Sequence, residues 1–203
     1  EVAPANELPD PGAANPLLVV SGSCSPVTER QIQGALDAGF AEVGLDTTAL
    51  ARDERDDAPI RSARTAVVDH LFAGRSVVLH TARGEGDPRI QETARILAGR
   101  GLDDLAAKTF VPRVFGAALG QVARAAVEQR GLRRLGISGG DTSGFLARAL
   151  GIEAVEMIGP IAPGAPLCRA HAPGSAAHGL EVSFKGGQVG HPDYFVVLRR
   201  GRP

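Results

Sequence analysis

The sequence predicts a three-layer α/β/α fold with a mostly parallel mixed sheet and antiparallel strands late in the chain. From Leu17 onward, short apolar runs typical of buried strands alternate with longer stretches of helical spacing. Such alternation is typical of a parallel sheet with helices on both faces. After Gly151 the pattern changes to short strands joined by Pro- and Gly-containing connections, which indicates an antiparallel extension.

The first predicted strand covers residues 17–23 and leads into a helix from about Pro26. Ser25 suits the N-cap position, with Pro26 in the first helical turn and Gly39 at the C-terminal stop. The final segment, 193–200, fits either a strand or a short helix. The other predicted elements, in order, are a strand at 41–46, a charged loop at 52–59, a helix at 60–74, a strand at 76–82, a loop at 83–88, helices at about 90–99 and 111–129, a strand–turn–helix unit at 135–151, and strands at 154–159, 165–171 and 180–186.

The bulk composition excludes several classes of function. The 203 residues are 43% hydrophobic and 22% charged, with a net charge of −1, so neither nucleic acid nor an anionic membrane is an expected partner. Aromatic residues make up only 4%, too few for a platform that stacks bases. The two cysteines show no metal-ligand spacing, and no apolar run is long enough to span a bilayer. We therefore expect a cytoplasmic globular domain.

The first sixteen residues differ from the rest of the chain. "EVAPANELPDPGAANP" begins with Glu rather than Met and is rich in Pro, Ala and Asn, which is typical of a linker or of the edge of an expressed fragment. We accordingly assign residues 1–16 to such a linker and residues 17–203 to one domain of a longer protein.

A first loop that suits chemistry, "SGSCSP", joins a strand end to a helix start. Ser21, Ser23 and Ser25 offer hydroxyl groups, and Gly22 allows close approach of the backbone. A helix N-terminus carries unpaired N–H groups and partial positive charge, which suits phosphate. A capped turn without any ligand explains this loop equally well.

The second loop, "SGGDTSG", has the same position between a strand and a helix. Gly139 and Gly140 can bring backbone amides against a ligand. Asp141 is a candidate ligand for Mg²⁺, and an ordinary N-cap is its alternative role. Either of the following hydroxyl residues can cap the helix or contact a phosphate; the remaining residues of this candidate site are Thr142, Ser143 and Gly144.

The third loop, "KGGQVG", follows the predicted strand at 180–186. Lys185 can place an ammonium group near a phosphate, and Gly186, Gly187 and Gly190 can offer backbone amides. A simple connecting turn with a surface lysine is the alternative. Ligands of open parallel sheets bind at the carboxyl ends of the strands, where all three loops are predicted to lie.

Standard fingerprints are missing from the sequence. It has no P-loop motif and no G-x-G-x-x-G after the first strand. The five histidines form no metal-spaced cluster, and a hydrogen-bonded structural role is expected for His80. "GGDTSG" lacks the G-x-S-x-G spacing of a hydrolase elbow. A hydrolase that uses Cys24 or Ser143 nevertheless stays an alternative.

Four motifs in this order resemble the C-terminal nucleotide-binding domain of the four-carbon acid sugar kinase family, a family whose members are also described as Hrp-dependent type III effectors. The resemblance extends from Leu17 over nearly the whole chain. In the third loop, Gly186, Gln188 and Val189 stand where the family often shows Ser, Asn and Phe. The four motifs are "VVSGSCSPVTERQI", "ISGGDTSGFLARALGI", "IGPIAPGAPLCRA" and "LEVSFKGGQVGHPDYF".

The resemblance implies a kinase that uses ATP and Mg²⁺ to phosphorylate four-carbon sugar acids, or their keto forms, at the 4-hydroxyl. It places ATP on the three glycine-containing loops. From the residues themselves, we expect the "GPIAPGAPL" loop to line the adenine or ribose pocket, because prolines stiffen a loop against a flat ring. The family's Asp-Asp-x-Thr-Gly motif is missing here. We therefore expect the sugar acid and the catalytic base on an N-terminal domain absent from this chain, so that the isolated domain is inactive.

Besides the hydrolase, one further alternative to the kinase remains open from the sequence. A nucleotide-sensing or partner-binding module without catalysis would share the same loops. A homo-oligomer is possible in either case.

Overall fold

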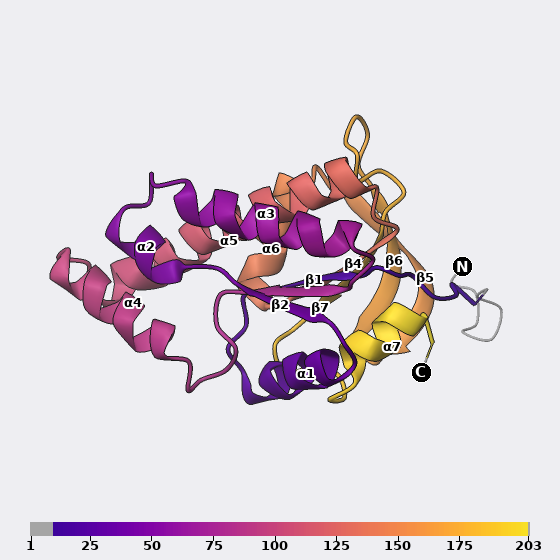
Figure 1. Cartoon of the computed structure of the whole chain (residues 1–203), viewed down its shortest axis with the longest axis horizontal. Coiled ribbons are helices and arrows are strands. Elements are labelled where there is room, and N and C mark those ends of the chain that lie inside the picture. The colour runs from indigo at the N-terminus through magenta and orange to yellow at the C-terminus, as the bar shows by residue number, and fades with distance from the viewer. Residues whose placement is uncertain (1–9, 203) are drawn as a thin grey trace.

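A computed structural model describes residues 10–202 and confirms the three-layer α/β/α class (Figure 1). Its seven strands form one sheet in the order β2-β3-β1-β4-β7-β6-β5. The strands are β1 Leu18–Ser21, β2 Ala41–Gly44, β3 Val77–His80, β4 Arg134–Ser138, β5 Ala154–Ala162, β6 Ala165–His171 and β7 Glu181–Lys185. The helices are α1 Pro26–Asp37, α2 Thr47–Arg52, α3 Ala58–Phe72, α4 Pro88–Gly99, α5 Asp104–Arg130, α6 Gly140–Ala149 and α7 Tyr194–Arg200.

The sheet is parallel over five strands and antiparallel at one end. Strands β2, β3, β1, β4 and β7 run parallel, whereas β6 pairs antiparallel with both β7 and β5. The late antiparallel strands predicted after Gly151 are therefore confirmed. The chain passes from β1 to the edge strand β2, returns inward to β3 beside β1, and then crosses to the other side of β1 with β4, which creates a topological switch point between β1 and β4.

Two apolar clusters lie on opposite faces of the sheet. Helices α3, α5 and α6 cover one face, and α1 and α7 cover the other (Figure 1). The fully buried side chains of Leu18 and Val20 point into the first cluster, while those of Leu17 and Val19 point into the second. A strand covered on both faces reads as a continuous apolar run, which is why "LLVV" has no polar alternation.

Three elements differ from their predicted form. Helix α2 was not predicted; Asp46 caps it by accepting hydrogen bonds from the amides of Thr48 at 3.1 Å and Ala49 at 2.9 Å. Helix α5 begins seven residues before the predicted start near Val111 and carries Pro112 in its interior. The segment 193–200, left open between strand and helix, forms α7 at Tyr194–Arg200.

The segment before β1 packs on the domain. Ala14 is buried, and its amide donates to the carbonyl of Arg199 at 2.8 Å. The buried guanidinium of Arg134 donates to the carbonyl of Gly12 at 3.0 Å and forms an ion pair with Glu181 at 2.6 Å. The rest of the proposed linker, residues 1–9, lies outside the described residues. Within residues 10–202, no helix has the length and apolar character needed to cross a membrane.

Candidate functional site

The three loops converge at one edge of the sheet. Strands β1, β4 and β7 are neighbours, and their registers pair Ser21 with Ser138 and Ser138 with Lys185. The strands are parallel, so their carboxyl ends and the loops that follow meet at the same edge. Main-chain bonds join the loops: the Gly22 amide donates to Ser138 O at 2.9 Å, and the Gly139 amide donates to Lys185 O at 3.0 Å.

The serines of the first loop are held by the protein itself. Ser25 caps α1 by accepting a hydrogen bond from the Thr28 amide at 3.2 Å, as predicted. Its hydroxyl also donates to Gly187 O at 2.6 Å, which joins the first loop to the third. Ser23 Oγ accepts from Ser25 N at 3.3 Å, and the buried Ser21 Oγ accepts from Ser23 N at 3.3 Å. The serine hydroxyls of this loop are therefore engaged by the protein itself.

The first and second loops approach so closely that glycine is required at the contact. Gly139 has φ 122°, a conformation that side chains disfavour, and a Cβ there would lie 3.3 Å from backbone atoms of Gly22 and Ser23. A Cβ on Gly22 would collide with the side chain of Thr142. Gly22 and Gly139 thus permit the first and second loops to pack backbone against backbone.

Helix α6 begins without a side-chain cap. Its N-cap is Gly139, and no side chain among residues 10–202 accepts from its first amides. The predicted capping by Thr142 or Ser143 is wrong: Ser143 Oγ donates to Gly139 O at 2.6 Å, because the glycine at the N-cap position has no side chain and the serine lies a turn beyond it. The leading amides, from Gly140 onward, stay available with the positive end of the helix dipole. This arrangement suits an anion.

Lys185 is buried beneath the loops rather than on the surface. Its side chain is 2% exposed, and the ammonium donates to Ser138 Oγ at 2.9 Å, Thr28 Oγ1 at 3.3 Å and Gly186 O at 3.0 Å. All three acceptors are neutral, and no described carboxylate forms an ion pair with it. Burial lowers the pKa of Lys185 to about 8. The alternative of a surface lysine in a plain turn is therefore excluded.

Thr28 is a central residue that the sequence analysis missed. Its hydroxyl lies 2.9 Å from Gly187 O, 3.1 Å from Ser23 Oγ and 3.3 Å from Ser138 Oγ, so its single proton can be donated to any one of these oxygens. Together with the bond from Lys185, these contacts place one hydroxyl among all three loops. The only local signal is its position three residues after the N-cap Ser25, and that spacing alone predicts a capping contact.

The third loop supplies one glycine, Gly187, to the place where the three loops meet, the convergence point. A Cβ on Gly187 would lie 2.5 Å from Ser23 Oγ, so this position also needs a bare backbone. Gly186 is exposed beside it. Two predicted site glycines lie further away: Gly144 is inside α6 near Arg148, and Gly190 lies beside Tyr194.

Asp141 is exposed in the first turn of α6 and stands alone as a potential metal ligand. The residues that the structure describes contain no group of three or more acidic, histidine or cysteine side chains that would hold a metal. Magnesium in phosphotransferases is usually held by one or two carboxylates together with phosphate oxygens and water. A single carboxylate beside a helix end that suits an anion fits that mode and does not fit a cage made of protein ligands alone.

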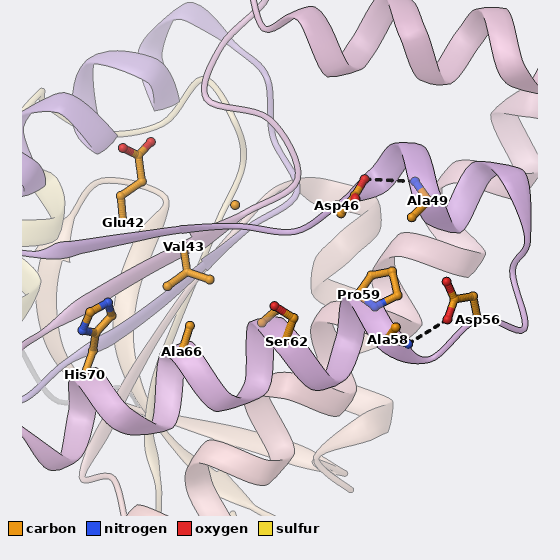
Figure 2. Close-up of a pocket in the computed structure, with 12 residues that line it drawn as sticks. Glu42, Val43, Asp46, Ala49, Asp56, Ala58, Pro59, Ser62, Ala66 and His70 are labelled. Carbon is orange, nitrogen blue, oxygen red and sulfur yellow. Dashed lines mark hydrogen bonds between the residues drawn. The ribbon is translucent and has the colours of Figure 1, made fainter.

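Three cavities adjoin different parts of the domain. One of about 480 Å³ opens at the convergence point, where Gly22, Cys24 and Asp141 form part of its wall. A second, of about 560 Å³, lies between β2, α2 and α3 and contains no predicted site residue (Figure 2). A third, of about 520 Å³, lies at the β5–β6 hairpin and is lined by Met157 and the proline-rich segment 160–166.

The hydrolase alternative finds no catalytic partners. Among residues 10–202 no histidine forms a hydrogen bond with Ser143 or Cys24, and the Ser143 hydroxyl is engaged by a main-chain carbonyl. His80 lies in β3, where its Nε2 is 3.0 Å from Glu42 Oε1 and burial lowers its pKa. Its role is the structural one that the sequence suggested.

Comparison with known proteins identifies related sequences. A family described as the nucleotide-binding C-terminal domain matches residues 18–195. The chain is 38% identical to a 3-oxo-isoapionate kinase of Paraburkholderia graminis, over 98% of this chain and 42% of that protein. It is 30% identical to a 3-oxo-tetronate kinase of Cupriavidus necator, over 91% of this chain and 38% of that protein. A D-threonate kinase of Salmonella typhimurium is also 30% identical, over 74% of this chain and 34% of that protein. The chain thus spans about two fifths or less of these relatives.

Solved structures share the fold. A putative tRNA synthase of Salmonella typhimurium superposes with a TM-score of 0.71 at 20% identity, over 95% of this chain and 42% of that one. A domain of unknown function from Bordetella bronchiseptica, a domain-swapped dimer with bound citrate, gives a TM-score of 0.67 at 23% identity, over 94% of this chain and 43% of that one. At these identities the likeness establishes the architecture alone.

Proposed function

Because the chain belongs to the family of nucleotide-binding C-terminal domains found in four-carbon acid sugar kinases, we propose that it binds ATP for phosphoryl transfer to a sugar acid. The acceptor is a tetronate, an oxo-tetronate or a related acid, phosphorylated at its 4-hydroxyl. The uncapped start of α6, enclosed by the first and third loops, is the observation that carries the proposal. The three relatives are named for different sugar acids, which supports a substrate site outside the matched region.

The residues of the convergence point contribute to polyphosphate binding in different ways. The amides at the start of α6 are donors that face outward with the helix dipole behind them. The buried Lys185 adds positive charge from below, and its bonds to Thr28 and Ser138 keep the loops in place. Phosphoryl transfer needs positioning and charge neutralisation more than covalent chemistry. This cradle provides both, and bound ATP supplies the phosphoryl group.

Asp141 is the residue that would hold Mg²⁺ beside the phosphates. The catalytic base and the sugar acid are expected on a further domain of the longer protein. No described residue of this chain is assigned the role of base. We accordingly expect the isolated chain to bind nucleotide without phosphorylating an acceptor.

The test compares two substitutions at Gly140, the first residue of α6. Gly140→Pro removes one outward amide while proline is well tolerated at the first helical position. Gly140→Ala retains the amide, and a Cβ at this position meets no atom within 4 Å. We expect isothermal titration to show MgATP binding to the unmodified chain and to Gly140→Ala, with at least a tenfold loss in Gly140→Pro. No heat of binding from the folded, unmodified chain at millimolar MgATP would refute the proposal.

A further inference from the structure

One face of α1 holds the third loop by its carbonyl groups. Thr28 and Gln31 are three residues apart, so they lie on the same face of the helix. The Thr28 hydroxyl lies 2.9 Å from Gly187 O. The side-chain nitrogen of Gln31 donates to Val189 O at 2.9 Å and to His191 O at 3.0 Å. Alternate carbonyls of the third loop are therefore bound by side chains of α1.

These contacts fix the direction of the amides that lie between the carbonyls. A trans peptide group is planar, so its C=O and the N–H that follows point in opposite directions. Gly187 O and Val189 O are turned toward α1. The amides that follow them, of Gln188 and Gly190, therefore point away from this helix. Because α1 and α6 cover opposite faces of the sheet (Figure 1), both amides point to the side from which α6 starts.

Both amides are free in the part of the chain that the structure describes. Neither Gln188 N nor Gly190 N donates a hydrogen bond within residues 10–202. Gln188 is exposed and Gly190 is half-buried, so a ligand can reach them. Backbone N–H groups that point outward from a turn form sites that suit anions.

The surroundings of Gln31 are unfavourable for a residue that only stabilises the fold. Its side chain is fully buried, and its Oε1 has no hydrogen-bond partner among residues 10–202. Rotating the amide group would not help, because the oxygen would then face two carbonyl oxygens. A buried acceptor without a partner lowers stability, and an apolar side chain of similar length would avoid that loss. The distinctive contribution of Gln31 is therefore its two donors to the third loop.

We infer that Gln31 is a positioning residue of the nucleotide site, which holds the third loop in the shape that turns the amides of Gln188 and Gly190 toward the phosphates. The inference rests on the proposed function, because that function supplies the phosphates at the start of α6. The free amides of α6 and those of the third loop then contact the phosphate chain from two sides. Without the Gln31 donors, the peptide groups of the third loop can rotate and their amides lose this common direction.

A purely structural link between α1 and the loop is the competing role. It requires that the two hydrogen bonds of Gln31 stabilise the free protein and that nucleotide affinity does not depend on them. The unpartnered Oε1 opposes this role, because it offsets the stability gained from the two bonds. The two roles therefore differ in the quantity that changes on substitution, which is either the melting temperature or the affinity.

Gln31→Met and Gln33→Met form a matched pair of variants on one helix. Gln31→Met removes both donors to the third loop and keeps a side chain of similar length. The control replaces an exposed glutamine whose side-chain nitrogen donates to Asp37 in the same helix at 2.6 Å. The melting temperature of each chain is measured, followed by isothermal titration with MgATP. Hydrogen exchange by NMR then follows the amides of Gln188 and Gly190 in the unmodified chain, with and without MgATP.

We expect Gln31→Met to bind MgATP about tenfold more weakly, because hydrogen bonds to the charged phosphates are lost. Its melting temperature should stay within about 3 °C of the unmodified chain, and Gln33→Met should match the unmodified chain in both quantities. MgATP should slow the exchange of both amides by about tenfold or more.

Unchanged MgATP affinity in Gln31→Met overturns the inference while the proposed function stands. Exchange that saturating MgATP leaves unchanged at either amide does the same, and this measurement decides alone if Gln31→Met does not fold. Failure of the unmodified chain to bind MgATP overturns both the inference and the proposed function.

Discussion

Replacing Lys185 by methionine separates two roles that a buried lysine can have. The ammonium donates to three neutral oxygens and has no described carboxylate as an ion-pair partner. If the lysine is retained to attract phosphate, its buried charge lowers the stability of the folded protein when no phosphate is bound. If it is retained to hold the loops together, its removal loosens them. Methionine keeps much of the apolar stem and removes the charge.

The size of the effect on stability follows from the pKa of Lys185. Burial lowers this pKa from 10.5 to about 8. At about 1.4 kcal/mol per pKa unit, keeping the side chain protonated in the folded state costs roughly 3 kcal/mol at neutral pH. The hydroxyls of Thr28 and Ser138 lie 3.3 Å apart and can bond to each other once the lysine is gone. We therefore expect the free energy of unfolding of Lys185→Met to be unchanged or raised by up to about 3 kcal/mol.

The pH dependence has a definite sign. Between about pH 8 and 10.5 the unfolded chain keeps the proton on Lys185 while the folded chain releases it. Stability therefore rises with pH in that window for the unmodified chain relative to Lys185→Met. Phosphate favours the charged form, so MgATP affinity should fall as the pH rises above about 8 in the unmodified chain, but not in the variant.

Urea unfolding and isothermal titration measure the two quantities. We expect MgATP to bind Lys185→Met at least tenfold more weakly at pH 7, with Lys108→Met, an exposed lysine, as the control for stability. A variant that is less stable by more than about 2 kcal/mol, yet binds MgATP with unchanged affinity, would refute the reasoning. The lysine would then be a structural link between the loops.

Three further predictions concern the second loop and the buried ion pair. Asp141→Asn should weaken MgATP about tenfold and leave metal-free ATP unaffected in parallel titrations, because one carboxylate ligand of Mg²⁺ is lost; equal losses for both would exclude the metal role. Gly139→Ala should lower the urea-derived free energy of unfolding by about 1–3 kcal/mol, since its φ of 122° strains any side chain; a neutral result would mean that the loop relaxes. Glu181→Gln should cost about 3–5 kcal/mol by leaving the buried Arg134 unpaired, whereas Glu128→Gln in an exposed pair should cost under about 0.5 kcal/mol; similar costs for both would contradict this account.

Much of the architecture was predictable because it depends on local patterns. The apolar run at 17–20 has no polar alternation, since β1 is covered on both faces. Ser25 and Pro26 mark the start of α1 by chemistry within a single turn. The start of α5 was missed because Pro112 resembles a first-turn residue, and the actual cap at Asp103 lies nine residues earlier. A proline inside a helix costs stability, and in α5 the burial of the following turns outweighs that cost. This burial depends on tertiary packing, which the local pattern does not show.

The sequence by itself determined the α/β class, the order of most elements and the three glycine loops. Only the tertiary structure decided how those loops meet. Thr28 and Lys185 are 157 residues apart, and neither the shared hydroxyl nor the burial of the ammonium has a local signature. The amides at the start of α6 are likewise free because no described side chain caps them, which the local sequence does not reveal. Such features arise from contacts between segments that are distant in the sequence. The sequence shows which residues each segment contains, but not which segments come into contact.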